Sequence, residues 1–526
     1  MGLKKTDSGD PGAASSWRKR RLALAVLLLM ATGLRLWESD LVPVTADEGS
    51  HVGQAMFIAV AGLADWPLAG LPSLGVRNSA LFIYLVTLAE MVWWHPLSGV
   101  VLVAGLNVAA IWLAWRFAWR YLGPGAAWFG CVLWTVSPWS VIYGRTMWPP
   151  SCLAVVTVLL WGAGLEWLQQ GGRRRLAWLG FLSVVLPQVH FSGLCALPWL
   201  AVVLWSGRKQ LLAWPLLGGL FAGVLTWAPW ILFHMRNGLD AGVGGFLQGK
   251  QGIVETVGHV LTDLQSLLHS GGFSFWFGLS SSELPGLFPS TLRAAATGVA
   301  VLLVTGLLAS SVLSLRCEKS LPARLLLWWI AMPVIGLVIL RPQIQPHYLL
   351  VAYPAPWLLL GWGVGRLVES RPRMGRVAVT ALAVTVVVHG MILAGWYRYV
   401  SDGQNDGRGQ FQLSYRQRRA AVMVMIEDFA GRRIPLAGSF NGTNPRYEFI
   451  YRFEQFRRNH SAKPIDRGRR YFVEVPRPDQ STAADAVLRR INQTLSSGQP
   501  NTTKWQVEQN WQVGPTHIHR IRRVVF

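Results

Sequence analysis

The chain of 526 residues is 52% hydrophobic and only 14% charged, with 28 tryptophans and a formal net charge of +23. This balance excludes an ordinary soluble domain and is typical of a protein that crosses the membrane several times. Its lysines and arginines stand in short clusters between apolar runs, as they do in cytoplasmic loops, so the positive charge indicates no nucleic-acid partner.

A first membrane-spanning helix is expected directly after a basic cluster. The cluster Trp17–Arg21 precedes an apolar run from Leu22 to about Leu36, and no cleavage site of the signal-peptide kind follows closely. We therefore predict a cytoplasmic tail over residues 1–21 and an uncleaved first helix with its N-terminus in the cytoplasm.

Further apolar runs lie near the roughly 20 residues that a membrane-spanning helix needs. They cover residues 97–118, 124–143, 151–168, 176–189, 192–205, 211–233, 292–315, 323–340, 349–367 and 377–396. The two runs on either side of Val189 are short and predict a broken hairpin near one face. Together with the first helix, the runs predict an α-helical polytopic membrane protein of about eleven transmembrane helices over residues 22–397.

The run from Ser79 to Trp94 decides on which side every later loop lies. If it crossed the membrane, the basic clusters near Arg120, Arg174 and Arg208 would lie outside, against the preference of Lys and Arg for cytoplasmic loops. We therefore interpret it as a re-entrant or membrane-surface helix inside an external loop over residues 37–94. A second long external loop then covers residues 234–291.

The chain turns polar and basic after Trp396. Short alternating runs such as Tyr471–Val475 are typical of strands. Residues 398–526 are enough for a small α/β C-terminal domain, which the loop assignment places on the extracytoplasmic side of the plasma (inner) membrane.

Acidic residues are scarce on the external side, and Asp47 and Glu48 form an adjacent pair there. They follow Thr45, a suitable N-cap for the helix that the sequence predicts from Gly49 to Ala61. Acids in a first turn are ordinary capping and dipole residues, which is the alternative to catalysis. At a membrane interface, however, burial raises the pKa of a carboxyl group toward the range of a general base.

Several cations and aromatic residues share the predicted external side. The arginines are suited to holding a phosphate, although interfacial arginines also anchor proteins in the bilayer. His190, His347 and Tyr348 lie at predicted helix ends, where packing and anchoring roles are common. The arginines are Arg77, Arg145, Arg236 and Arg341. His51 would share a helix face with Asp47, but no third ligand stands nearby for a metal.

Five motifs, in chain order, resemble the GT-C membrane glycosyltransferases, and among them the protein O-mannosyltransferase and lipid A aminoarabinose transferase families (glycosyltransferase family 39-like). The first is the acid pair with its helix, the second a surface helix, the third an arginine-containing loop, the fourth a broken hairpin and the fifth a late His-Tyr plus proline motif. They read DEGSHVGQAM, RNSALFIYL, VIYGRTMWPPSCLA, LPQVHFSGL and PHYLLVAYPAPWLLLG. The resemblance covers roughly residues 20 to 400.

The resemblance implies a GT-C-like fold and an inverting glycosyltransferase that uses a polyprenyl-phosphate sugar donor on the periplasmic face. It implies Asp47 as the general base and Glu48 as its companion acid. The acceptor hydroxyl would belong to a glycan, a lipid or a protein. For binding the donor phosphate or sugar we expect Arg77, Arg145, His190, His347, Tyr348 and Arg341.

One departure from the family pattern bears on metal use. The later carboxylate of the third motif is missing, because Trp148, Pro149, Pro150 and Ser151 stand where an acid is expected. Its absence favours chemistry without a cofactor, so that a divalent metal is disfavoured, and it also leaves a catalytically inactive relative as an alternative. A polytopic transporter or flippase of lipid-linked glycans is a further alternative, disfavoured because the predicted spans hold few ionisable residues.

Overall fold

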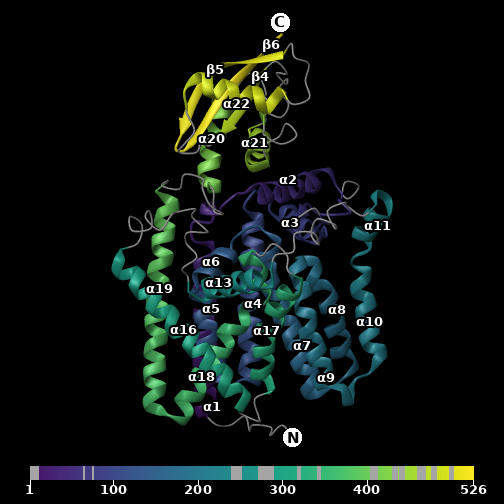
Figure 1. Cartoon of the computed structure of the whole chain (residues 1–526), viewed down its shortest axis with the longest axis vertical. Coiled ribbons are helices and arrows are strands. Elements are labelled where there is room, and N and C mark those ends of the chain that lie inside the picture. The colour runs from purple at the N-terminus through teal and green to yellow at the C-terminus, as the bar shows by residue number, and fades with distance from the viewer. Residues whose placement is uncertain are drawn as a thin grey trace.

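A computed structural model shows a bundle of long helices with a small domain of strands and helices at one end (Figure 1). We call this end the sheet end. The structure describes residues 11–62, 66–73, 76–238, 252–269, 289–316, 321–340, 345–402, 413–428, 436–437, 445–458, 469–474, 482–496 and 503–525.

The bundle is built from apolar helices that pack around a core rich in tryptophan. Its main helices are α1 (Pro11–Leu36), α4 (Ser98–Tyr121), α7 (Leu153–Gln170), α8 (Arg173–Val189), α9 (Leu197–Ser206), α10 (Ala213–Leu225), α11 (Ala228–Asn237), α13 (Ile253–His269), α16 (Ser290–Arg316), α17 (Leu321–Leu340), α18 (Pro354–Ser370) and α19 (Pro372–Ser401). In the described part of the chain, five helical segments are long and apolar enough to cross a membrane, and the bent pair α10–α11 makes a sixth. The chain is thus a multi-pass helical membrane protein, whereas the count of about eleven spans stays a prediction.

Two runs that we expected to be continuous helices are broken, and proline explains both breaks. The first forms a π-helical turn (Ala126–Gly130), α5 (Cys131–Val136) and α6 (Pro138–Tyr143), with Pro138 as the first residue of α6. The second bends by 55° between α10 and α11, where Pro229 lies in the first turn of α11. Proline has no N–H to donate and disfavours helical geometry in the residue before it, so the prediction of unbroken helices was wrong at these two points.

The first long loop carries two helices that lie side by side across the sheet end of the bundle (Figure 1). They are α2 (Ala46–Ala61) and α3 (Leu81–Val92), joined through the short antiparallel pair β1 (Pro72–Ser73) and β2 (Val76–Arg77). The 12 residues of α3 are too few to cross a hydrocarbon core of about 30 Å, in agreement with the interpretation of residues 79–94 as a helix that does not span.

The C-terminal residues form a four-stranded sheet with helices, as predicted. The strand order is β3-β4-β6-β5, with β3 parallel to β4 and the other neighbours antiparallel. The elements are α20 (Tyr415–Asp428), β3 (Leu436–Ala437), α21 (Pro445–Arg457), β4 (Arg469–Glu474), α22 (Ala484–Ser496), β5 (Thr503–Val513) and β6 (Thr516–Val525). The predicted strand at Tyr471 is therefore confirmed, and the domain boundary at residue 398 stays a prediction.

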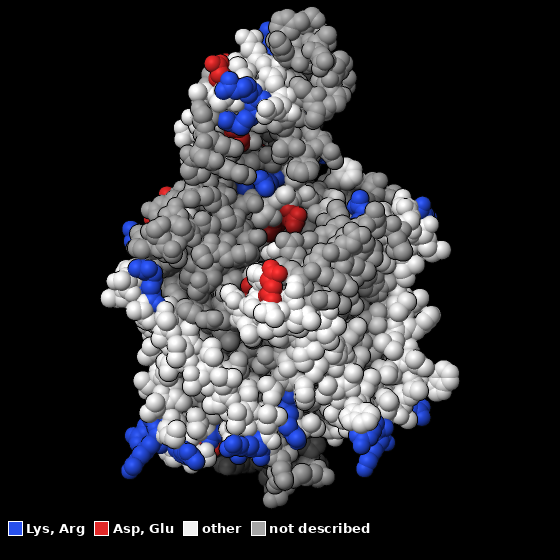
Figure 2. Space-filling view, in the orientation of Figure 1, with Lys and Arg blue, Asp and Glu red and all other residues white. Residues whose placement is uncertain are grey.

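Basic side chains gather at the end of the bundle opposite the sheet (Figure 2). The connection between α18 and α19, which contains Arg371, lies at this end (Figure 1). Most of the acidic side chains visible in this view lie toward the sheet end (Figure 2). The two ends of the bundle therefore differ in charge, as the loop assignment from sequence requires.

The π-helical turn and α18 approach each other so closely that only glycine fits. A Cβ atom on Gly361 would lie 2.7 Å from the Cα atom of Gly130 and 3.0 Å from the carbonyl oxygen of Ala126. Gly361→Ala is expected to lower the free energy of unfolding by about 1–3 kcal/mol, the usual cost of overpacking. Thermal unfolding of the detergent-solubilised protein measures this effect. Gly105→Ala is the matched control, because a Cβ atom there meets nothing within 4 Å, and equal melting temperatures for the two variants would contradict the prediction.

Candidate functional site

The segment that leads into the predicted acid pair is fixed by the start of α20. Pro43 forms an isolated antiparallel bridge with Ser414. The backbone N–H of Val44 donates to the carbonyl oxygen of Leu413 at 3.2 Å, and the N–H of Tyr415 donates to the carbonyl oxygen of Val42 at 2.9 Å. The chain entering α2 is therefore held by a segment far away in the sequence.

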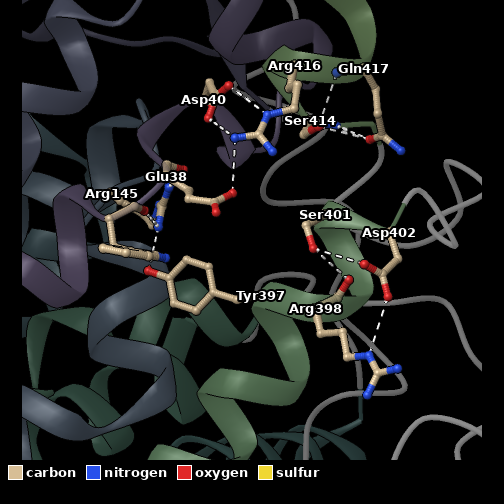
Figure 3. A network of polar contacts seen from close by, with 11 residues as sticks. Glu38, Asp40, Arg145, Tyr397, Arg398, Ser401, Asp402, Ser414, Arg416 and Gln417 are labelled. Carbon is tan, nitrogen blue, oxygen red and sulfur yellow. Dashed lines mark hydrogen bonds and ion pairs between the residues drawn. The ribbon is translucent and has the colours of Figure 1, made fainter.

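An ion-pair network strengthens this connection (Figure 3). The guanidinium group of Arg416 donates to both carboxylate oxygens of Asp40, at 2.7 and 2.8 Å, and to the carboxylate of Glu38 at 3.0 Å. Such a bidentate pair fixes orientation as well as distance. Arg416 belongs to α20, so the C-terminal domain is joined to the first loop by a side chain as well as by backbone.

The predicted cap of α2 is present in full. The side chain of Thr45 accepts a hydrogen bond from the N–H of Asp47 at 3.2 Å. The carboxyl group of Glu48 accepts from the N–H of Thr45 at 2.9 Å and also bonds its hydroxyl. This reciprocal arrangement is a capping box, which satisfies N–H groups that a helix leaves without partners in its first turn.

The two acids of this turn have different surroundings. Glu48 is 2% exposed, and burial raises its pKa to about 8, so its carboxyl group is largely protonated at neutral pH. Asp47 reaches solvent; the protein around it raises its pKa, while the positive charge of Arg446 opposes this effect. Adjacent carboxyl groups in unlike environments are suited to unlike roles, one neutral and one ionised.

His51 supports the same turn from the second turn of α2. Its Nδ1 lies 2.6 Å from the carbonyl oxygen of Asp47, and because a carbonyl oxygen only accepts, Nδ1 carries the proton. Burial lowers the pKa of His51 to about 4, so its ring stays neutral. In the part of the chain that the structure describes, no group of three or more His, Cys, Asp or Glu side chains is arranged to hold a metal ion.

A cavity of about 640 Å³ opens next to the acid pair, between α2 and α21. This volume is within the range of about 300–1,000 Å³ that is usual for ligand pockets. Its walls are mainly apolar and aromatic, and they begin two residues after Asp47. The lining includes Gly49, Gly53, Phe57, Trp94, Phe449 and Phe453.

Arg145 lies inside the protein rather than on a loop surface. Its side chain is fully buried and donates to the carbonyl oxygen of Trp37 at 2.8 Å, to the hydroxyl of Tyr397 at 2.5 Å and to the carbonyl oxygen of Glu38. Glu38 has a φ of 45°, an unusual value for a residue other than glycine. In this geometry Arg145 holds the turn after α1 in place (Figure 3). A contact of Arg145 with the sugar donor or its phosphate stays a prediction.

The structure brings three predicted residues together in a second group. The ring centroid of His190 lies 5.4 Å from that of His347 and 5.6 Å from that of Tyr348. Trp148 packs on His347 with ring centroids 4.4 Å apart. Nδ1 of His190 accepts the N–H of Ser192 at 3.2 Å, which leaves the proton of a neutral ring on Nε2. The short turns after α8 and before α18 thus present a cluster of hydrogen-bonding rings.

The remaining predicted cations fall elsewhere. The guanidinium of Arg77 lies 5.2 Å from the ring centroid of Phe233, and the backbone oxygen of Arg77 accepts from the indole N–H of Trp230 at 2.7 Å. This arginine therefore packs against α11. Arg341 lies outside the described residues, as does most of the predicted loop 234–291.

Sequence reasoning missed two arginines of the C-terminal domain. Arg446 of α21 acts electrostatically on Asp47, and Arg418 of α20 acts on Glu48. No local pattern links these positions to the acid pair, because about 400 residues separate them. Covariation between distant positions is the kind of signal that would have found them.

Comparison with known proteins identifies the fold. No protein-family model and no curated protein sequence matches the chain. The structure is similar to that of ArnT from Cupriavidus metallidurans bound to undecaprenyl phosphate, with a TM-score of 0.57, 13% identity and coverage of 96% of this chain and 98% of that chain. The apo state of the same protein gives a TM-score of 0.57 and 15% identity over 97% and 98% of the two chains. The oligosaccharyltransferase of Archaeoglobus fulgidus in complex with Zn and sulfate matches with a TM-score of 0.49 and 12% identity. The match covers 81% of this chain and 61% of that chain.

The likeness to ArnT extends over nearly the whole of both chains. The predicted resemblance is therefore confirmed only as a likeness of fold to ArnT.

The raised pKa of Glu48 makes stability depend on pH. Between pH 4.5, the ordinary pKa of a glutamate, and about pH 8, Glu48 keeps a proton in the folded protein that it has lost in the unfolded chain. Stability is therefore expected to fall as the pH rises through this window, by at most about 1.4 kcal/mol per unit. Glu48→Gln keeps the capping oxygen and should remove this part of the fall, as chemical denaturation at a series of pH values will show.

The control is Glu369→Gln, which changes an exposed glutamate of α18. A stability profile that is equally steep in wild type and in Glu48→Gln would refute a protonated Glu48.

Proposed function

We propose that this protein is an inverting glycosyltransferase that moves a sugar from a polyprenyl-phosphate donor to an acceptor hydroxyl, with Asp47 as the general base. The observation that carries the proposal is the acid pair in the first turn of α2, one acid solvated and the other buried, beside a cavity at the sheet end of an ArnT-like fold.

In the proposed reaction, Asp47 accepts the proton of the acceptor hydroxyl while the oxygen attacks the anomeric carbon of the sugar. The attack comes from the face opposite the phosphate, so the configuration inverts as the polyprenyl phosphate leaves. The carboxylate must be ionised and open to the acceptor, which agrees with the exposure of Asp47 and with the positive charge of Arg446, which lowers the pKa of Asp47.

Glu48 has a different part in this proposal. Its buried, largely protonated carboxyl group completes the cap of α2 and adds little negative charge beside the base. Asp47 thereby avoids the repulsion that would arise between two adjacent carboxylates.

The leaving phosphate needs hydrogen-bond donors and positive charge. We assign this role to the cluster of His190, His347 and Tyr348. The Nε2–H of His190 is one such hydrogen-bond donor. A contact of Arg77 or Arg341 with the sugar donor stays a prediction. The choice of a polyprenyl phosphate follows the resemblance of the sequence and is supported by the undecaprenyl phosphate bound to ArnT.

We place the reaction on the extracytoplasmic (periplasmic) face of the plasma (inner) membrane. The support is the distribution of charge: Lys and Arg gather at the end opposite the sheet, and cytoplasmic loops carry such clusters. In this orientation the N-terminus is cytoplasmic, and α2, α3 and the C-terminal domain are external.

Replacing the base tests the mechanism. Asp47→Asn keeps the size and polarity of the side chain but cannot accept the proton, so transfer from a synthetic polyprenyl-phosphate sugar should fall by about 10²–10⁴-fold. Single-turnover assays with purified protein and a panel of sugars and acceptors measure the rate. Asp402→Asn, at an exposed ion pair beyond α19, is the control and should retain the wild-type rate. Full turnover by Asp47→Asn would remove Asp47 from the mechanism.

We further propose that transfer requires no divalent metal, since the third motif lacks the carboxylate that metal-binding relatives use as a ligand. Transfer by purified protein should then keep its rate after treatment with EDTA and removal of the chelator. A loss of rate that returns on adding Mg²⁺ or Mn²⁺ would replace this proposal by a metal-assisted one.

A further inference from the structure

Three arginine side chains of the C-terminal helices share one buried carboxylate. Nε of Arg419, in α20, lies 2.7 Å from the carboxylate of Glu454, in α21. The guanidinium groups of Arg457 and Arg458 lie 3.2 and 3.9 Å from the same carboxylate. Glu454 is fully buried, whereas a third or more of each arginine side chain is exposed. We call Arg419, Arg457 and Arg458 the arginine cluster. Because its three cations face one anion, the cluster carries an excess of positive charge at the protein surface.

Neighbouring exposed arginines of the same helices have enough acidic partners. Arg452 of α21 pairs with Glu448 at 2.6 Å. Arg416 of α20 pairs with both Asp40 and Glu38, at 2.7 and 3.0 Å. Among the described residues, the arginine cluster has a single carboxylate within ion-pair distance. The excess charge is therefore particular to this place, where it attracts an anion from outside the chain.

The end of α21 next to the cluster packs against the segment that leads into a spanning helix. Trp94 packs on Phe453 and Phe456, with ring centroids 5.3 and 4.6 Å apart. His95 packs on Phe453 with ring centroids 5.0 Å apart. Shortly afterwards, at Ser98, begins α4, whose 24 residues are long and apolar enough to cross a membrane. The end of such a helix lies at the level of the lipid headgroups, so the last turn of α21 lies near that level too.

Large apolar side chains are exposed in the same region. Met91, Val92 and Trp93 at the end of α3 are all exposed, and Val92 reaches 89%. Phe456, the residue before Arg457, is 52% exposed. Exposed apolar residues, and tryptophan in particular, are typical of the membrane interface next to a spanning helix. Arginines on the same surface add attraction to anionic lipids.

We propose that the arginine cluster binds the phosphate groups of anionic lipid headgroups, so that the end of α21 rests on the bilayer surface. A planar guanidinium group matches a phosphate through two parallel N–H···O bonds. A lipid headgroup is favoured over a soluble anion, because exposed apolar side chains flank the cluster and a spanning helix begins next to it. The inference goes beyond the proposed function and does not depend on the role of Asp47.

The proposed contact links the bilayer to the acid pair through one helix. The first residue of α21 packs on α2, since a Cβ atom on Gly49 would lie 2.8 Å from the carbonyl carbon of Pro445. The other end of α21 carries Phe453 and Phe456, which line the cavity between the two helices. The lipid surface thus fixes the far end of the helix that forms one wall of this cavity.

The test measures how fast each arginine reacts in protein held in lipid nanodiscs. Phenylglyoxal modifies free guanidinium groups, and a bound phosphate slows this reaction. Full-length protein is placed in nanodiscs of phosphatidylcholine alone or of phosphatidylcholine mixed with phosphatidylglycerol, and modification of each arginine is followed by peptide mass spectrometry. The anionic lipid should slow the modification of Arg419, Arg457 and Arg458 by about fivefold, the factor that corresponds to one arginine held at an anionic membrane surface.

Two arginines of the same protein serve as internal controls. Arg452 lies in the same helix as the cluster and pairs with Glu448. Arg398 lies at the sheet end of α19 and pairs with Asp402. Any anionic surface lowers the local pH and slows all nearby arginines somewhat, so the rates of the cluster are compared with those of Arg452 and Arg398. Equal slowing of the cluster and the controls would overturn the inference, as would no slowing at all.

A double variant and a free ion complete the test. Arg457→Gln combined with Arg458→Gln removes the excess charge but leaves Arg419 with its partner Glu454. In this variant phosphatidylglycerol should no longer slow the modification of Arg419, and slowing as strong as in wild type would speak against the cluster. Inorganic phosphate is added to wild-type protein in phosphatidylcholine nanodiscs. Protection by inorganic phosphate without protection by phosphatidylglycerol would assign the cluster to a soluble anion and so overturn the inference.

Discussion

The close contact of α2 with the C-terminal helices is the constraint on which the candidate site depends. Asp47 belongs to a loop that follows the first helix of the chain, and such a loop has little to fix it by itself. Here the strand-like segment before it bonds to the start of α20, and the glycines after it pack on α21. The acid pair is therefore clamped from both sides by residues that are translated about 400 positions later. A site at the first turn of α2 exists in this geometry only when the whole chain has folded.

Tertiary packing also explains why two neighbouring carboxyl groups differ. In an isolated helix, both acids of the first turn would be solvated and stabilised by the helix dipole. In the folded chain Glu48 is buried, whereas Asp47 stays at the surface. Burial keeps Glu48 protonated, and its carboxyl group serves the capping box. Asp47 keeps access to solvent and is influenced by the charge of Arg446. Tertiary packing, rather than the local sequence, thus separates the structural acid from the candidate base.

The local features were the ones that the sequence could predict. The cap at Thr45, the helix that follows it and the strand at Tyr471 each depend on a few adjacent residues, and all three are present. The breaks at Pro138 and Pro229 also have local causes, and they were missed because apolar length was given more weight than proline. The burial of Arg145 and the position of Arg446 depend on contacts between distant segments. Neither can be derived from periodicity or spacing.

The arrangement of charges has one more consequence for the proposed reaction. A helix N-terminus commonly binds an anion through its free N–H groups, and the first turn of α2 would be a natural place for a phosphate. Here two N–H groups at the start of α2, those of Thr45 and Asp47, already bond the side chains of Glu48 and Thr45. The proposed phosphate site lies on other elements, because the rings of His190, His347 and Tyr348 lie on turns of the bundle rather than on α2. In the proposed mechanism, base and phosphate are thus held by different parts of the fold, as an attack from the face opposite the leaving group requires.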